Sequence, residues 1–355
     1  MPLNKKPTTN NQRPTTNFLT FDIEDYFHVS AFEAVSPPES WEGRERRVEG
    51  NTERLLGVLD EHGVTATFFV LGWVAERAPG LVRRIAAAGH EVASHGYGHR
   101  RVGTQTRDEF RDDVRRAKAL LEDLSGQPVR GYRAPSYSIG PTCLWAFDEL
   151  IEAGHTYDSS VFPVRHDLYG LSDWPRFPFF LERLEGEGAG NWVPAEEVAP
   201  DRRGQGGRGP ESRNPAWPAG GNQQPTTNNQ QPLLEVPITT LRLAGRSVPI
   251  AGGGYFRLFP YRFTRWGLRR INEREGRPFV FYLHPWELDP GQPRIDGAGL
   301  KSRLRHYLNL EKTEGRLRRL LRDFRFRPIG GEGGAQRAAP LDSPAPPGRE
   351  REGMP

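Results

Sequence analysis

The sequence has a single cysteine, Cys143, among its 355 residues. One thiol excludes an intramolecular disulfide and a zinc site built from cysteines. The chain also lacks any run close to the roughly 20 apolar residues that a membrane helix needs, so no transmembrane segment is predicted. Its opening stretch, MPLNKKPTTNNQRPTTNF, contains no apolar signal-peptide core. These absences predict a cytoplasmic protein, with the inner membrane face as a second location.

The sequence also has no large excess of basic over acidic residues or the reverse. The sequence has 49 Lys and Arg against 45 Asp and Glu, which gives a formal net charge of +4. The arginines occur in scattered pairs beside acidic residues, a pattern typical of solvated helix faces. A nucleic-acid surface would need one basic stripe with interleaved aromatic residues. We therefore expect no nucleic-acid partner, and the sequence leaves the oligomeric state open.

Two polar segments punctuated by proline resemble each other. They read PTTNNQRPTTN (7–17) and NQQPTTNNQQP (222–232). Sequences of this composition have too few apolar residues to form a hydrophobic core. We expect a disordered N-terminal segment at 1–17, a low-complexity insertion at 186–232 and a disordered tail at 331–355. The folded parts are then 18–185 and 233–330, the second completing the first.

The remaining sequence alternates between short apolar runs and amphipathic stretches. In 106–125, for example, apolar residues recur at a spacing of three and four, which predicts a helix. Strands that alternate with helices indicate βαβ units and a parallel sheet. At least six such units predict an α/β fold of the barrel type, in which chemistry gathers at the C-terminal ends of the strands. The expected strands begin or end near 18–23, 64–72, 90–95, 129–135, 234–243 and 278–285, and the expected helices span 51–63, 79–89, 106–125, 142–154, 261–275 and 312–324.

Ionisable residues follow these strands in five separate places. Two histidines in SHGYGH, His95 and His99, lie four residues apart beside glycines that allow a turn. Two imidazoles and a carboxylate are sufficient to hold a catalytic divalent metal with open positions for water and substrate. The ionisable or turn-forming candidates at the strand ends are Asp22, Glu24, Asp25, His95, His99, Arg133, Pro135, Asp158, His284 and Glu287.

Four stretches, TFDIED, SHGYGH, RGYRAPSYS and YLHPWE, resemble the successive motifs of the NodB-homology polysaccharide deacetylases, carbohydrate esterase family four. The likeness covers 17–185 and 233–328. It implies a distorted (β/α) barrel with fewer than eight complete units and a metal-dependent hydrolase that removes N-acetyl groups from amino sugars. By motif position, the resemblance implies Asp22 as catalytic base, His95 and His99 as metal ligands, Arg133 as the residue that orients the base, and His284 as catalytic acid.

The first motif departs from the family pattern of two adjacent aspartates. Ile23 follows Asp22, and the next carboxylates belong to Glu24 and Asp25. A relative in the same superfamily spaces its carboxylates by one residue, and residues two apart on a strand point to the same side. Both arguments favour Glu24 as the third ligand, with Asp25 as the alternative. Zinc is the first choice among divalent metals, although this departure leaves the metal open.

Three further roles are expected from residue type. Asp158 would pair with His284 and keep it protonated, or it would form a turn before the two serines that follow it. Because sugars bind on aromatic faces, Tyr97, Tyr137 and Trp286 are candidate substrate platforms beside Pro135. His28 could approach the metal, but a structural role is favoured.

The expected substrate is an N-acetylated oligo- or polysaccharide or its precursor. The stretches DIEDYFH and GGGYFRLFP resemble a subgroup found in bacterial exopolysaccharide loci with exosortase systems, which implies exopolysaccharide assembly machinery as a partner. One alternative keeps the metal cage but opens a small cyclic amide, as allantoinase does. Another is a non-catalytic carbohydrate-binding barrel, which would have lost the base or the acid; Asp22 and His284 are both present.

Overall fold

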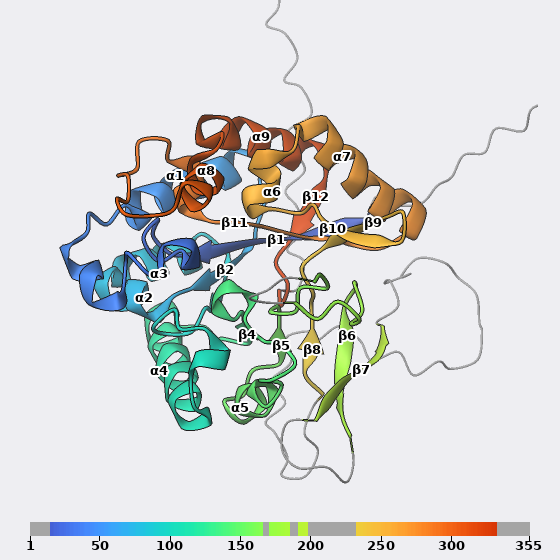
Figure 1. The fold of residues 1–355 in the computed structure, drawn as a ribbon, viewed down its shortest axis with the longest axis horizontal. Helices are drawn as coiled ribbons and strands as arrows, with labels where there is room; N and C mark the ends of the chain where they lie inside the picture. The colour runs from blue at the N-terminus through green and yellow to red at the C-terminus, as the bar shows by residue number, and fades with distance from the viewer. Residues whose placement is uncertain (1–14, 166–169, 185–190, 198–231, 332–355) are drawn as a thin grey trace, which may run out of the picture.

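The computed structural model describes residues 15–165, 170–184, 191–197 and 232–331. A curved row of parallel strands forms its centre (Figure 1). Beyond these strands the sheet continues through two antiparallel strands, β6 (Phe179–Arg183) and β7 (Trp192–Glu197). The parallel strands, in spatial order, are β11 (Val280–Leu283), β1 (Thr16–Ile23), β2 (Thr67–Val70), β3 (Glu91–Ser94), β4 (Gly131–Tyr132), β5 (Tyr157–Asp158) and β8 (Leu234–Glu235).

Helices cover the outside of this row. Figure 1 shows α7 and α9 beside β11 and β12 (Arg325–Arg327), and α4 and α5 beside β4 and β5. β12 pairs in parallel with the start of β1, and a separate ribbon is formed by β9 (Thr240–Leu243) and β10 (Arg246–Pro249). The helices are α1 (Val48–Glu61), α2 (Gly72–Arg77), α3 (Pro79–Ala87), α4 (Arg107–Ser125), α5 (Ala146–Glu152), α6 (Gly253–Leu258), α7 (Tyr261–Arg270), α8 (Leu300–Tyr307) and α9 (Leu310–Asp323), with short turns η1 (Ser30–Phe32), η2 (Pro38–Gly43), η3 (Val102–Thr104), η4 (Pro135–Tyr137), η5 (Ile271–Glu275) and η6 (Pro285–Leu288).

The central strand β1 is buried on both faces, and its two faces differ in chemistry. Leu19, Phe21 and Ile23 pack in the largest apolar cluster of the molecule. Side chains alternate along a strand, so Thr20 and Asp22 point to the opposite side, toward the interior of the curved sheet. The sequence TNFLTFDI therefore forms a strand that packs apolar residues on one face and delivers polar groups to the other.

The prediction of an α/β fold with an incomplete barrel is confirmed. Among the described residues, no backbone ladder joins β8 to β11 to close the ring. The free edge of β11 is met by other contacts: the Val280 N–H donates to Thr239 Oγ1 at 2.7 Å, and Gly252 forms an isolated parallel bridge with Tyr282. The barrel is thus completed by single contacts, because the chain after β8 runs past β11 without forming a strand beside it.

Several predicted boundaries need correction. β1 begins at Thr16, inside the segment predicted to be disordered, and β7 lies within 186–232. The predicted low-complexity insertion 186–232 thus contains one strand, whose pairing partner β6 precedes it in the chain. Residues 1–14, 185–190, 198–231 and 332–355 lie outside the described residues, so most of the predicted disorder is not tested.

Gly252 allows the backbone approach that closes the barrel. Its φ is +123°, a value that favours glycine, and a Cβ there would lie 2.0 Å from the Tyr282 carbonyl oxygen. Gly252→Ala should therefore lower the free energy of unfolding by about 2 kcal/mol or more. Urea denaturation measures this change.

The matched control is Gly57→Ala in the middle of α1, where a Cβ would meet nothing within 4 Å. Alanine is the better helix former, so this variant should gain up to about 1 kcal/mol. Equal stability of the two variants would contradict the role given to Gly252.

Candidate active site

The polar strand ends converge at one edge of the sheet. Asp22 is the last residue but one of β1, His95 directly follows β3, and Arg133 directly follows β4. Because these strands are parallel, their C-terminal ends lie together. Figure 1 shows the arrowhead of β1 pointing to this edge, where β11 also ends before His284. The expected gathering of Asp22, Glu24, His95, His99, Arg133 and His284 is present.

Glu24, His95 and His99 form the cluster that could hold a metal ion. One ligand atom of each residue lies within 4.8 Å of the others. Glu24 Oε2 lies 2.6 Å from His99 Nε2, yet this buried oxygen has no hydrogen-bond partner among the described residues. His95 Nδ1 contacts the Arg133 carbonyl oxygen at 2.8 Å, which leaves Nε2 free to bind an ion. An orphaned oxygen and two imidazoles directed at one point fit a divalent cation, and this donor set suits zinc.

The electrostatics of the cluster also favour a cation. Burial raises the pKa of Glu24, but the imidazoles of His99 and His284 outweigh it and hold that pKa below its usual range. Burial lowers the pKa of His95 to about 4, so its ring is neutral at physiological pH. An ionised carboxylate and a neutral imidazole are the forms that bind metal.

The structure chooses between the two carboxylates of the first motif. Asp25 points away from the cluster: its Oδ2 accepts hydrogen bonds from the N–H groups of Arg47 (2.8 Å) and Val48 (3.0 Å). These N–H groups lie at the N-terminus of α1. Arg47 is the N-cap residue of this helix, and its side chain does not cap it. Asp25 therefore caps α1 from a distant part of the sequence, and Glu24 is the residue placed with the histidines.

His28 has a fixed place beside the cluster, but it does not offer a ligand atom. Its Nδ1 accepts a hydrogen bond from the Asp25 N–H at 2.8 Å, so the neutral ring carries its proton on Nε2. Burial lowers the pKa of His28 well below its usual value. The ring packs between Trp41 and Trp73, with centroids 4.4 and 5.0 Å away. The favoured structural role agrees with this packing.

The loop between His95 and His99 is held by a residue that the motif analysis did not identify. Asp113 on α4 accepts hydrogen bonds from the N–H groups of Tyr97 (2.7 Å) and Gly98 (2.9 Å). Gly96 has φ +71°, and a Cβ there would lie 2.8 Å from Asp113 Oδ2. The tight loop is thus shaped by a carboxylate of the following helix. In the sequence, Asp113 is one acid among many on an amphipathic helix, so no local pattern distinguishes it.

Asp22 is held by a fully buried guanidinium. Arg133 Nη1 donates to Asp22 Oδ1 at 2.6 Å and to Thr20 Oγ1 at 2.9 Å, and Nη2 donates to Ser159 Oγ at 2.9 Å. The second oxygen of Asp22 faces the Tyr137 hydroxyl at 3.4 Å and His284 Nε2 at 3.8 Å. One carboxylate oxygen is therefore fixed by the ion pair, and the other is directed toward the site.

His284 takes its partner from its own turn. Its Nδ1 contacts Glu287 Oε1 at 2.8 Å, and the other Glu287 oxygen accepts from Arg257 Nε at 2.6 Å. Burial lowers the pKa of His284, but the hydrogen bond to Glu287 and the charge of Glu24 raise it, with a net value of about 9. Glu287 was a strand-end candidate without a role, and Arg257 was missed although it lies within GGGYFRLFP.

The predicted pairing of Asp158 with His284 is wrong. Asp158 is fully buried and accepts two hydrogen bonds from Ser160, one from Oγ at 2.6 Å and one from N–H at 3.1 Å. Its neighbour in register on β8 is Glu235, also fully buried. Burial raises the pKa of Asp158 and raises that of Glu235 well above its usual value. The turn-forming alternative for Asp158 matches this geometry better.

The candidate platforms for sugar are placed differently from one another. The ring of Tyr97 is covered by the Arg116 guanidinium at 3.5 Å, and its hydroxyl donates to Glu76. Trp286 is buried, stacks on His284 at 5.0 Å between centroids, and donates from Nε1 to Glu24 Oε1 at 3.3 Å. Trp286 therefore offers no free face as a platform, and one face of Tyr97 is covered by Arg116. Pro135 and Tyr137 lie in η4 and are buried, with the Tyr137 hydroxyl directed at Asp22.

The choice of Glu24 over Asp25 can be tested with zinc binding. Glu24→Gln removes the anionic ligand and should weaken zinc binding by roughly a hundredfold. Asp25→Asn should leave zinc affinity within about threefold but lower the free energy of unfolding by about 1 kcal/mol, because it disturbs the cap of α1. Competition with a chelator and urea denaturation measure the two effects. Strong zinc loss in Asp25→Asn alone would contradict the assignment.

The buried Asp158 and Glu235 pair should make stability depend on pH. Both pKa values are raised in the folded state, so folding takes up protons and stability falls as pH rises above the unfolded values of 3.8 and 4.5. Glu235→Gln should flatten this decline in urea denaturation between pH 5 and pH 9. Glu182→Gln, at an exposed position on β6, serves as the control and should keep the wild-type slope. An unchanged slope in Glu235→Gln would refute the claim that these two buried carboxyls make the free energy of unfolding fall as pH rises.

Comparison with known proteins matches the chain in two parts. Residues 10–151 match the family model "Polysaccharide deacetylase", and residues 200–331 match "Domain of unknown function (DUF3473)". Asp22 and the candidate metal cluster lie in the first part, whereas His284, Glu287 and Arg257 lie in the second.

Individual relatives agree with the first match. A peptidoglycan-N-acetylglucosamine deacetylase of Bacillus cereus is 37% identical over 84 residues, which cover 24% of this chain and 30% of the relative. A chitooligosaccharide deacetylase of Sinorhizobium fredii is 36% identical over 126 residues, covering 35% of this chain and 54% of the relative. The chain thus spans about a third to a half of the length of these curated relatives. The crystal structure of a protein assigned as a polysaccharide deacetylase, from Mycobacterium smegmatis, covers 92% of this chain and 91% of its own at 19% identity, with a TM-score of 0.47. The family match and the two curated relatives identify a polysaccharide deacetylase domain within residues 10–151 of this chain.

Proposed function

We propose that this protein is a metal-dependent deacetylase that hydrolyses the N-acetyl groups of amino sugars in an oligo- or polysaccharide. One observation carries the proposal. A cluster fit for a divalent ion lies between a carboxylate held by arginine, Asp22, and an imidazole held by a carboxylate, His284. Amide hydrolysis needs an activated water, a base for its proton and an acid for the leaving amine, and these groups lie within one site.

The base is Asp22. Its Oδ1 is held by Arg133, and its Oδ2 faces the site. A carboxylate that is paired with a buried guanidinium cannot rotate freely, so its second oxygen is held in position to accept a proton from water. The hydroxyls of Thr20 and Ser159 accept hydrogen bonds from other guanidinium N–H groups, and these bonds fix Arg133 in place beside Asp22.

The acid is His284, which would protonate the sugar amine as it leaves. Glu287 accepts from Nδ1, so the proton to be transferred lies on Nε2. That atom is 3.8 Å from Asp22 Oδ2 and 3.6 Å from Glu24 Oε1, so it faces the base and the metal cluster together. An amine is a poor leaving group unless it is protonated during departure.

Glu24, His95 and His99 would hold the ion. When bound, a divalent ion supplies a Lewis acid that polarises the acetyl carbonyl and lowers the pKa of a water in the site. Zinc is our choice, because two imidazoles and one carboxylate match the ligand set of catalytic zinc with an open position. Trp286 supports the cluster by donating to the remaining oxygen of Glu24.

The substrate class rests on the relatives and on the motifs. The matched relatives are named as deacetylases of peptidoglycan and of chitooligosaccharide, both polymers or oligomers of sugars. The DIEDYFH and GGGYFRLFP stretches resemble the exopolysaccharide-associated subgroup. We therefore extend the proposal to exopolysaccharide biosynthesis, with an N-acetylated precursor as substrate.

Acetate release from N-acetylglucosamine oligomers tests the function. Zinc-loaded protein should release acetate, metal-stripped protein should not, and zinc should restore release. Asp22→Asn should lower kcat by roughly a hundredfold to ten-thousandfold while zinc stays bound, because only the base is lost. Asp123→Asn, an exposed change of the same chemistry on α4, should keep full activity. Zinc-loaded protein that releases no acetate from any oligomer, or full activity in Asp22→Asn, would overturn the proposal.

A further inference from the structure

The short helix α8 carries two leucines that face solvent. Leu300 is 82% exposed and Leu304 is 64% exposed, the two highest values among the exposed large apolar side chains of the described residues. They lie one turn apart on a helix of eight residues, so they share one face. Nothing in the fold requires apolar side chains on this face, and a contiguous exposed apolar pair next to a functional edge calls for a partner.

Basic side chains flank the leucine pair. With 3.6 residues per turn, Arg303 lies on one side of the pair, and Lys301 and Arg305 lie on the other. All three are exposed. From 294 to 319 the sequence has eight Lys and Arg against three Asp and Glu, although the whole chain is nearly balanced. An apolar face bordered by cations is the pattern of a helix that lies in the interface of a membrane.

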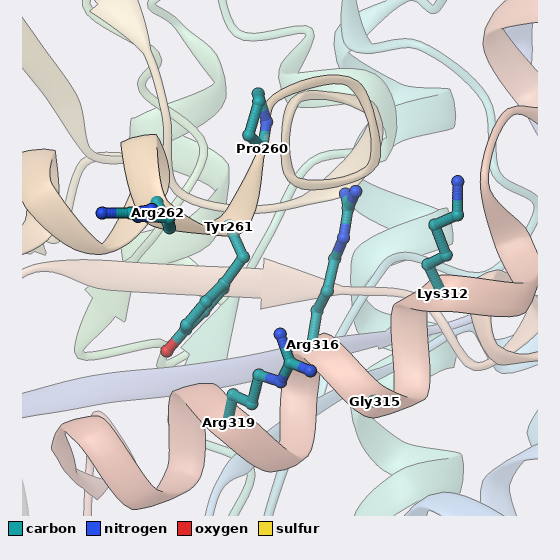
Figure 2. A pocket seen from close by; sticks show the side chains of 7 residues that line it. All are labelled: Pro260, Tyr261, Arg262, Lys312, Gly315, Arg316 and Arg319. Carbon is teal, nitrogen blue, oxygen red and sulfur yellow. The ribbon is translucent and has the colours of Figure 1, made fainter.

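Further basic side chains line a groove between α9 and the start of α7. The groove has a volume of about 470 Å³ (Figure 2). Figure 2 shows Lys312 and Arg316 projecting the same way from α9. Arg262 and Arg319 line the groove and, among the described residues, form no ion pair, whereas nearby Arg265 and Arg318 pair with carboxylates. The lining residues are Pro260, Tyr261, Arg262, Lys312, Gly315, Arg316 and Arg319.

Packing contacts connect these elements to one another and to the site. Arg257 on α6 donates to the carbonyl oxygens of Arg305, His306 and Leu308 at the end of α8. Arg316 on α9 donates to the carbonyls of Phe256 and Arg257. The exposed Leu258, at 55%, ends α6 between them.

The opposite face of α8 backs the candidate active site. His306 on this face is buried and stacks on Trp286, with ring centroids 4.2 Å apart, and Trp286 stacks in turn on His284. The leucine pair therefore lies on the outer side of the same edge of the molecule that holds the site. Among the described residues, no helix is both long and apolar enough to cross a membrane.

We propose that α8, with Leu300 and Leu304 as its apolar contacts and the surrounding cations as its electrostatic contacts, docks this protein onto an anionic phospholipid surface. The leucines enter the interface between headgroups and acyl chains, and Lys301 and Arg303 face the lipid phosphates. Docking in this orientation places the active site on the inner side of α8, one helix away from the bilayer. The protein would then be concentrated near N-acetylated saccharides that are attached to a lipid.

Sedimentation with lipid vesicles tests this inference on the full chain without any turnover, so it is independent of the deacetylase proposal. The protein should bind vesicles of phosphatidylcholine with 30% phosphatidylglycerol at low salt, and bind pure phosphatidylcholine at least about tenfold more weakly. Leu300→Ser with Leu304→Ser should weaken binding to the anionic vesicles by about tenfold, and Lys301→Glu with Arg303→Glu by about as much or more. All four positions are exposed, so the variants should fold.

Leu184→Ser is the matched control, because Leu184 is 47% exposed on the segment after β6 and carries no part of the basic surface. It should bind like wild type. Equal vesicle binding by the leucine pair variant, or no binding of wild type to anionic vesicles, would overturn the inference. So would light scattering that shows a dimer in wild type and a monomer in the leucine variant, since the face would then cover a second copy of the chain.

Discussion

The buried guanidinium of Arg133 is the interaction on which the site depends. It reaches from the end of β4 to Thr20 and Asp22 on β1 and to Ser159 after β5, and it lies over the ring of Phe69 on β2 at 4.0 Å. A fully buried cation is tolerated only when it is paired and its donors are used. Removing one partner of such a pair leaves an uncompensated charge, which typically costs about 3–5 kcal/mol. The contacts that offset the cost of burying the Arg133 charge thus also hold the strand ends together and orient the carboxylate of Asp22.

The two matched parts of the chain contribute different halves of the site. The first supplies the carboxylate base, its arginine and the cluster of Glu24, His95 and His99. The second supplies His284 with Glu287 and Arg257, and it also supplies Trp286, which donates to Glu24 across 262 sequence positions. The region matched to a domain of unknown function is therefore part of the candidate site, because it brings His284 next to Glu24 and donates a hydrogen bond to Glu24 through Trp286.

Long-range capping and packing link the site to the scaffold. Asp25 caps α1, and Asp289, five residues after His284, binds the side chain of Arg47 at the same helix end. Helix α1 is thus held at its start by residues next to the metal cluster and next to the acid. Rigid elements positioned by such contacts keep reacting groups in a fixed geometry, which amide hydrolysis requires.

The sequence by itself determined the main alternation of strands with helices, the placement of Asp22 and Glu24 on one side of the first strand, and the set of polar residues at strand ends. These follow from local periodicity and from the rule that parallel strands end together. Only the tertiary structure decided that Asp25 caps a helix instead of binding metal, that Glu287 and not Asp158 supports His284, and that Asp113 and Arg257 hold the site. Apart from the contact between His284 and Glu287 within one turn, each of those choices depends on side chains that meet across tens of residues, and no local pattern carries that information. The same holds for α8 (LKSRLRHY). Only the fold decides that one face of this helix is buried and that its two leucines are exposed.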